Sequence, residues 1–194
     1  MKTPAPSTFV PLVKNKNALK KRFNRLPAGI RPHFSYFLGL LDSKFPLEVT
    51  LAYLFTRVEL AHRDTLYCGI VRKHHAVAKL VSSVIRRQRI TRDGFLQFFE
   101  NLMGSQLPPV ILSKLKTAER IRDKAIHGSR PTDAELRNAI KDVLDYSEDY
   151  DSHVKRLAGF CPFGDLRGIL SGRAWRLDRP TTKLVLKGLG FKVS

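Results

Sequence analysis

The hexapeptide from Arg122 to His127, with the sequence RDKAIH, places a permanent cation and a titratable imidazole five residues apart. Arginine keeps its charge at any working pH and holds phosphate in a planar fork. The unperturbed pKa of histidine suits proton transfer near neutrality. Because the chain has a net charge of +18, a phosphate-binding group beside an acid/base group indicates chemistry on nucleic acid.

A second arginine and histidine pair, Arg57 and His62, has the same spacing. Five helical residues turn the chain by about 500°, so an ideal helix leaves the two side chains about 140° apart. The middle of a helix keeps such a pair separated, whereas the last turn of a helix can loosen. Gly128 directly follows His127 and suits a helix end. We therefore favour Arg122 and His127 as the functional pair.

Composition supports one basic helical domain. The chain has 194 residues, of which 43% are apolar, and 35 Lys and Arg residues oppose 17 Asp and Glu residues. The excess charge favours nucleic acid as the partner over an anionic membrane surface or an acidic protein. The basic residues gather in three stretches, which lie before Asp42, between Arg72 and Arg92, and after Arg167.

Several classes of protein are disfavoured. Cys68 and Cys161 are the only cysteines and belong to no ligand cluster, so we expect no structural metal, no cofactor and reduced thiols in a cytoplasmic protein. Prolines interrupt the N-terminal residues, so a signal peptide is not expected. No run of 18 apolar residues occurs, so we predict no membrane-spanning helix.

Apolar residues recur at helical spacing along most of the chain, and no stretch alternates as a strand would. We predict an all-α bundle over residues 31–159, after a basic arm over 1–30 that is extended or poorly ordered. A basic tail over 160–194 follows, anchored by Trp175. The predicted helices are 17–25 within the arm, 32–41, two helices between 47 and 89 that break near Lys73–His75, then 91–103, 109–127, 132–157 and 181–189.

The order of these elements around RDKAIH resembles HEPN domains, all-α domains with an R-polar-x-x-x-H motif near the end of a core helix. A capping box, Thr132 to Glu135, starts the next predicted helix, as the resemblance requires. The resemblance covers about residues 47–157, and the arm and tail lie outside it.

The resemblance implies a metal-independent endoribonuclease, of the toxin or defence type, that acts as a homodimer and leaves a 2′,3′-cyclic phosphate. His127 would be the general acid/base, Arg122 would hold the scissile phosphate, and Asp123 would orient one of them. A cognate antitoxin or another protein is a further partner to expect.

Two alternatives stay open for the motif. In both, Arg122 pairs with Glu119 or Asp123 on a solvated helix face and His127 caps the helix. The protein would then be a non-catalytic module that binds either nucleic acid or another protein.

Other residues are candidates to assist. Three polar residues of the first long helix could face the same cleft or form a salt-bridged surface: Glu59, His62 and Arg63. Six arginines are candidate RNA phosphate contacts: Arg86, Arg87, Arg89, Arg130, Arg173 and Arg176.

Overall fold

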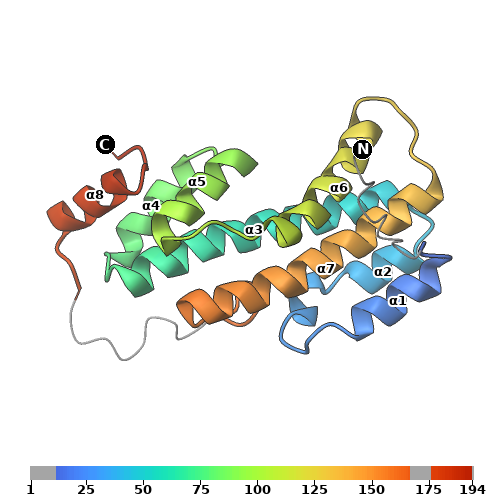
Figure 1. Ribbon diagram of the computed structural model, residues 1–194, viewed down its shortest axis with the longest axis horizontal. Coiled ribbons are helices and arrows are strands. Elements are labelled where there is room, and N and C mark those ends of the chain that lie inside the picture. Colours follow the sequence, from blue (N-terminus) through green and yellow to red (C-terminus); the bar gives the residue numbers. More distant parts are fainter. Residues whose placement is uncertain (1–11, 167–175, 194) are drawn as a thin grey trace, which may run out of the picture.

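The computed structural model describes residues 12–166 and 176–193 (Figure 1). Within these residues the protein has eight α-helices, one 3-10 helix and no strand, which confirms the all-α prediction for this part of the chain. The elements are α1 (Lys16–Asn24), η1 (Arg31–Phe34), α2 (Phe37–Asp42), α3 (Leu47–Lys73), α4 (Ala78–Arg87), α5 (Arg92–Met103), α6 (Pro109–Ile126), α7 (Asp133–Ala158) and α8 (Arg179–Gly188).

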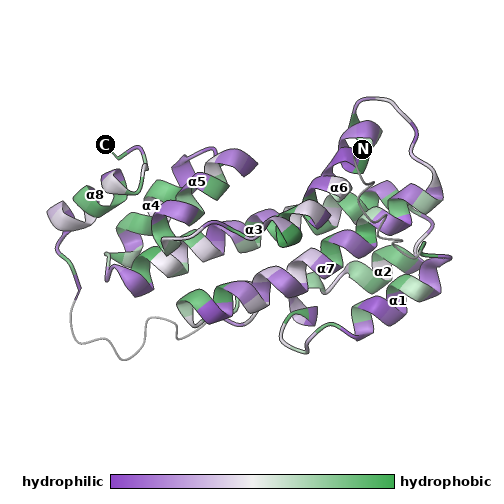
Figure 2. Cartoon of the chain, in the orientation of Figure 1, coloured by the Kyte–Doolittle hydropathy of each residue, from purple (hydrophilic) through white to green (hydrophobic). Residues whose placement is uncertain are grey.

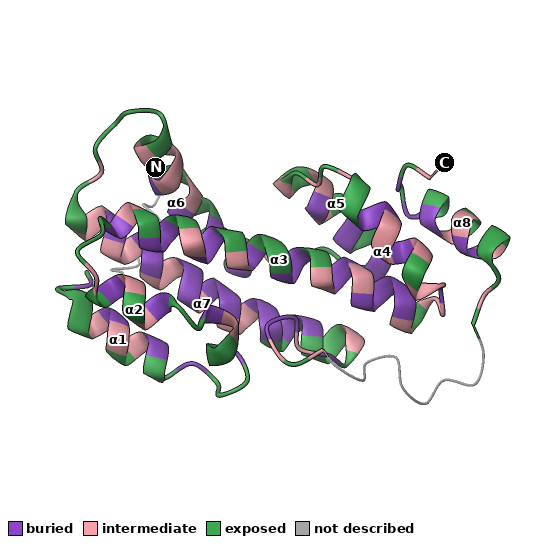
Figure 3. Ribbon diagram, turned by 180° about the vertical axis from the view of Figure 1, so that it is seen from behind, coloured by how far each residue is buried: buried purple, intermediate pink, exposed green. Residues whose placement is uncertain are grey.

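Helices α3, α6 and α7 form the centre of the bundle. Helices α3 and α7 run side by side in the same direction, since His62 contacts Tyr146 near their middles and Arg72 bonds to the Gly159 carbonyl near their ends (Figure 1). Helix α6 packs on both and runs opposite to α7. Hydrophobic and hydrophilic residues alternate along these helices (Figure 2), and buried residues recur where α3 and α7 adjoin (Figure 3).

The remaining helices cover this centre. Helices α1 and α2 pack on α7 and α3 at one end of the molecule, while α4 and α5 pack on the second half of α3 and α8 packs on α4 (Figure 1). Gly69, in α3, allows the close approach of α5, because a Cβ atom there would lie 2.6 Å from the side chain of Leu102. This arrangement brings the end of α4, the start of α5 and the second half of α6 around α3.

The helix ends follow the predicted signals in most places. Thr132 and Glu135 form the predicted capping box, and α3 ends at Lys73 with His75 at a positive φ of 53°. Gly128 also takes a positive φ, 82°, which an alanine would adopt only with strain. Helix α3 begins directly after Pro46, which supplies no side-chain cap.

Residues 12–30 join the bundle more closely than the sequence indicates, and residues 176–193 also pack on it. Residues 12–30 are not an extended arm, since α1 packs on α7 and its Leu19 and Phe23 are buried. The expected helix over 32–41 is divided into η1 and α2. In the tail, Phe163 and Leu186 are buried. Trp175, the predicted anchor, lies outside the described residues.

Two buried tyrosines of α7 bond to polar side chains of α3. The Tyr146 hydroxyl lies 2.7 Å from Nε2 of His62, and the Tyr150 hydroxyl donates to the Thr65 hydroxyl at 2.6 Å. Both tyrosine side chains are fully buried. These bonds set the register of α3 against α7, because a shift of either helix would leave buried polar atoms without partners.

We expect Tyr146→Phe to destabilise the protein more than Tyr150→Phe. Removal of the Tyr146 hydroxyl leaves the buried Nε2 of His62 unpaired, at a cost of about 1–3 kcal/mol. Removal of the Tyr150 hydroxyl costs about 1 kcal/mol, because the Thr65 hydroxyl still donates to the Ala61 carbonyl. Urea unfolding of the two variants measures the difference, and equal midpoints would contradict it.

Candidate nucleic-acid interface and acid/base site

Four adjoining hollows cross the surface formed by α3, α4, α5 and α6. We call them the His127 groove, the Arg122 pocket, the α3–α4 hollow and the α4 hollow. The α3–α4 hollow is lined by Leu60, Arg63, Asp64, Tyr67, Ser82, Ile85 and Arg86. The α4 hollow is lined by Lys79, Ser82, Ser83, Arg86 and Arg87. The groove and the pocket share Thr91, Arg92 and Glu119 in their walls. Arg63 lines both the pocket and the α3–α4 hollow, and Arg86 lines both the α3–α4 hollow and the α4 hollow. The four hollows therefore adjoin one another, and we call the row that they form the path.

The Arg122 pocket is a cavity of about 260 Å³ between α3, α5 and α6. Its floor is apolar, and its rim carries arginines from the three sides. The structure brings into it four residues that the sequence singles out besides Arg122, namely Glu59, His62, Arg63 and Arg89. The full lining is Phe55, Val58, Glu59, His62, Arg63, Arg89, Ile90, Thr91, Arg92, Phe95, Leu115, Glu119 and Arg122.

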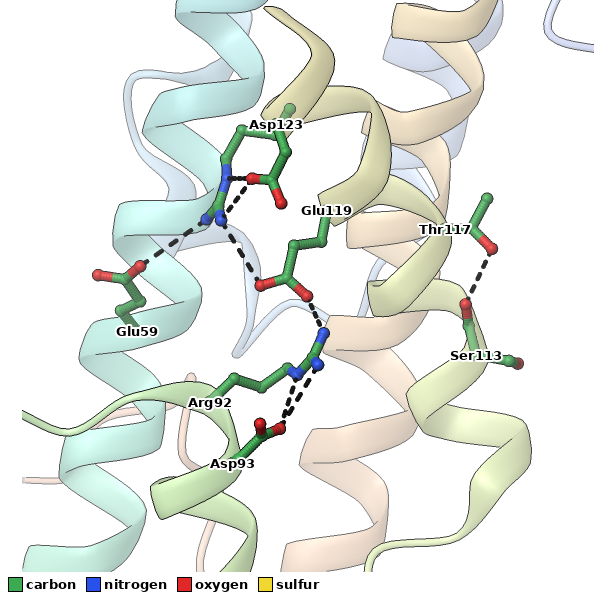
Figure 4. A network of polar contacts seen from close by, with 8 residues as sticks. Glu59, Arg92, Asp93, Ser113, Thr117, Glu119 and Asp123 are labelled. Atoms are coloured by element: carbon green, nitrogen blue, oxygen red, sulfur yellow. Dashed lines mark hydrogen bonds and ion pairs between the residues drawn. The ribbon is translucent and has the colours of Figure 1, made fainter. Parts of the chain in front are cut away.

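Arg122 is already engaged by neighbouring side chains (Figure 4). Its Nη2 lies 3.0 Å from Asp123 Oδ1 and 3.5 Å from Glu119 Oε1, and its Nη1 lies 4.0 Å from Glu59 Oε1. Its guanidinium carbon is 4.3 Å from the centre of the Phe55 ring, a cation–π contact. The pairings with Glu119 and Asp123 are those that the sequence offers as the alternative to a phosphate-binding role.

Glu119 joins this network to α5. Its Oε2 accepts from Nη1 of Arg92, the first residue of α5, while its Oε1 faces Arg122 (Figure 4). Arg92 also contacts Asp93, at 3.4 Å. The Glu119 carboxylate is 19% exposed, so water screens these contacts only in part. Glu119 thus forms the wall between the Arg122 pocket and the His127 groove.

His127 lies in a different hollow from Arg122. It is the exposed C-cap residue of α6 and lines the groove with Lys116, Arg120 and Lys124. Its side chain makes no hydrogen bond or ion pair with the described part of the chain. Asp123 also lines the His127 groove, although its carboxylate contacts Arg122.

The last turn of α6 is regular rather than loosened. The His127 N–H donates to the Asp123 carbonyl at 2.9 Å, and the Ser129 N–H donates to the Lys124 carbonyl at 3.0 Å across Gly128. Within one chain, the separation that an ideal helix imposes on Arg122 and His127 is therefore retained. Arg120 lies seven positions before His127. Because seven residues complete about two turns, Arg120 and His127 lie on nearly the same side of the helix.

His62 is a buried packing residue at the floor of the Arg122 pocket. Its ring stacks on Phe95, with ring centres 3.9 Å apart, and bonds to the Tyr146 hydroxyl. Burial lowers the pKa of His62 from 6.5 to about 3, so the ring is neutral at physiological pH. His62 is therefore a support of the pocket rather than a cation of its rim.

Cations without partners line the path from end to end. Seven exposed Lys and Arg side chains in its walls form no ion pair with the described part of the chain. They are Arg63, Lys79, Arg86, Arg87, Arg89, Lys116 and Arg120. Three of the predicted phosphate contacts, Arg86, Arg87 and Arg89, are in this set.

The other predicted contacts lie elsewhere. Arg130 is exposed beyond the end of α6 and lines none of the four hollows, and Arg176 is exposed just before α8. Arg173 falls outside the described residues. Sequence reasoning missed Lys79, Lys116 and Arg120. Lys116 and Arg120 could have been found, because they are four residues apart on α6 and therefore lie on one face of it.

Residues 12–166 and 176–193 contain no group of three or more His, Cys, Asp or Glu side chains placed to hold a metal ion. In the same residues, every helix is too short or too polar to cross a lipid bilayer. Comparison of the chain with protein-family models, curated proteins and solved structures finds no match.

We expect His62 to make the protein sensitive to acid. Because its pKa is about 3 when folded and 6.5 is the ordinary value, only the unfolded chain takes up this proton between those values. Stability supplied by the neutral ring is present above pH 6.5 and is lost as the pH falls towards 3. His62→Leu should reduce the slope of unfolding free energy against pH, by up to about 1.4 kcal/mol per pH unit in that window.

Urea unfolding of the wild type and of His62→Leu at a series of pH values measures this slope. The comparison isolates His62, because His33, His74 and His153 remain in both proteins, and burial lowers the pKa of each. Parallel pH profiles for the two proteins would refute the prediction.

Proposed function

We propose that this protein binds RNA along the four adjoining hollows and cleaves it as a metal-independent endoribonuclease, in the manner of the HEPN domains that its motif resembles. The observation that carries the proposal is the row of cations that form no ion pair with the described part of the chain and that ends in a groove with an accessible imidazole. Phosphates of a nucleic acid strand would displace the counterions of these cations, which favours binding.

Cleavage requires only groups that the chain and RNA supply. The ribose 2′-oxygen attacks the adjacent phosphorus, and the bond from phosphorus to the 5′-oxygen breaks. His127 accepts the proton from the 2′-hydroxyl while water protonates the leaving 5′-oxygen, or His127 protonates the 5′-oxygen while water accepts the 2′-proton, so the protons balance in either case. The products are a 2′,3′-cyclic phosphate and a 5′-hydroxyl.

Cations on both sides of the Glu119 wall would hold the phosphate. Arg120 shares the groove with His127 and lies in phase with it, while Arg122 reaches the strand from the adjoining pocket. In the homodimer that the motif implies, a second copy of the groove would face the first. Exposed Ile126, beside His127, supplies apolar surface for that contact.

RNA binding without cleavage is the second candidate function. It is favoured by the three carboxylates that surround Arg122 and by the separation of Arg122 from His127 within one chain.

Purified protein should cleave RNA in the presence of EDTA and leave cyclic phosphate ends. His127→Ala should lower the rate by about 100-fold or more, because general acid/base catalysis contributes about that much. Arg122→Ala and Arg120→Ala should each lower it as well, through lost charge stabilisation. Rates are measured by gel separation of end-labelled RNAs.

Arg25→Ala is the control, since Arg25 is exposed on the α1 side and lines none of the four hollows. Tight RNA binding with no cleavage of varied RNAs would remove the enzymatic part and leave the second candidate.

RNA affinity should fall steeply as salt rises. Each phosphate contact contributes about 0.7 to the slope of log affinity against log salt for a single strand. The double variant Arg86→Ala/Arg87→Ala should reduce the slope by about 1.4, whereas Arg25→Ala should leave it unchanged. Fluorescence anisotropy over a salt series gives the slopes, and an equal loss in the two variants would count against the path.

A further inference from the structure

The Arg122 pocket has a rigid apolar floor. Phe55, Val58, Phe95 and Leu115 are each at most 5% exposed, and their side chains come from α3, α5 and α6. The ring of His62 is held in place by the stack on Phe95 and by Tyr146. A ligand that enters the pocket therefore meets a preformed surface of ring edges and methyl groups.

The rim of the same pocket is cationic. Four arginines and two glutamates line the pocket, so its lining carries an excess of two positive charges. Arg92 and Arg122 share Glu119, and their charges are largely compensated. Arg63 and Arg89 are exposed and form no ion pair within the described residues, so they are available to an anion.

The size of the pocket limits what it can hold. Its volume of about 260 Å³ lies just below the ~300–1,000 Å³ of pockets that enclose drug-sized ligands. One flat aromatic group with an attached anion fits these dimensions. The combination of an apolar floor and a cationic rim matches the base and phosphate of a single nucleotide.

The pocket also adjoins another hollow on each side. The His127 groove lies across the wall formed by Thr91, Arg92 and Glu119, and the α3–α4 hollow lies across Arg63. A polymer that follows the path of cations must pass over the mouth of the pocket. This continuity favours a nucleotide within a strand over a free nucleotide.

We propose that the Arg122 pocket holds one unstacked nucleotide of a single-stranded RNA, with its base between the apolar floor and the Arg89 guanidinium and its phosphate on Arg63. The inference rests on the proposed RNA binding. Proteins that read single strands take up splayed bases in this way, and guanidinium planes stack on such bases. A strand anchored here would present the next phosphate to His127 across the Glu119 wall.

The test compares two oligomers of equal length and charge. One is a 2′-O-methyl oligouridylate, and the other has the same backbone without bases, so neither can be cleaved at a 2′-hydroxyl. The wild type should bind the base-bearing oligomer about tenfold more tightly, within the range of ~5–150-fold that stacking of one base supplies.

Arg89→Ala and Arg87→Ala form a matched pair, because both residues are exposed arginines and only Arg89 lines the pocket. Arg89→Ala should bring the ratio of the two affinities towards one. Arg87→Ala should weaken both affinities equally and preserve the ratio. A ratio unchanged by Arg89→Ala, or a wild type that binds both oligomers equally, would overturn the pocket assignment while RNA binding stands. If neither oligomer nor natural RNA binds at low salt, the proposed function itself fails.

Photo-crosslinking checks the location without relying on a variant. An oligomer with 4-thiouridine is irradiated with the wild type, and adducts are mapped by mass spectrometry. Adducts on the peptides that contain Phe55 or Phe95 are expected. Adducts confined to α4 would contradict the proposal.

A competition experiment distinguishes a nucleotide within a strand from a free nucleotide. Free uridine monophosphate in excess should compete only weakly with the oligomer for binding. Competition at the affinity of the oligomer itself would identify a free nucleotide as the ligand.

Discussion

The carboxylate of Glu119 is the contact on which the shape of this surface depends. It lies between Arg92 and Arg122, so one side chain of α6 ties together the start of α5 and the cation that rests on Phe55 of α3. Two arginines this close would repel each other without the shared anion. The contacts of Glu119 with Arg92 and Arg122 therefore form the wall between the Arg122 pocket and the His127 groove. They also hold α3, α5 and α6 at a fixed separation.

The buried contacts of α3 with α7 support this arrangement from below. Tyr146 and Tyr150 hold α3 in one register, and that register fixes His62 under Phe95 at the floor of the pocket. Polar contacts inside an apolar core specify position more strictly than apolar packing does, since a mismatch leaves unsatisfied atoms. The position of the pocket floor therefore depends on the buried polar contacts between α3 and α7.

Charge is distributed unevenly around this core. Helix α7 carries seven of the 17 acidic residues, and several are paired: Asp145 with Arg22 and Lys141, and Asp149 with Lys114. Arg22 of α1 and Lys114 of α6 are used in these pairs. The cations of α4, of the α4–α5 connection and of the other side of α6 have no such partners among residues 12–166 and 176–193, which leaves one strongly basic path on a molecule with a charge of +18.

The sequence by itself determined the helical class, most helix ends and the excess of positive charge. Helical spacing, glycines such as Gly128 and the box formed by Thr132 and Glu135 act over a few residues, so they can be read without a fold. It also pointed to Glu59, His62 and Arg63 as companions of Arg122, and to Arg89 as a phosphate contact. The packing of α1 was not foreseen, because a short basic helix acquires a buried face only when α7 is present.

Only the tertiary structure decided which charged side chains remain available. Arg122 and His127 belong to one motif in sequence, yet the regular last turn of α6 directs them into different hollows. The pairing of Arg92 with Glu119 depends on where α5 lies against α6, and the burial of His62 depends on Phe95 and Tyr146 from two other helices. Such contacts join residues far apart in the chain, so local spacing carries no information about them.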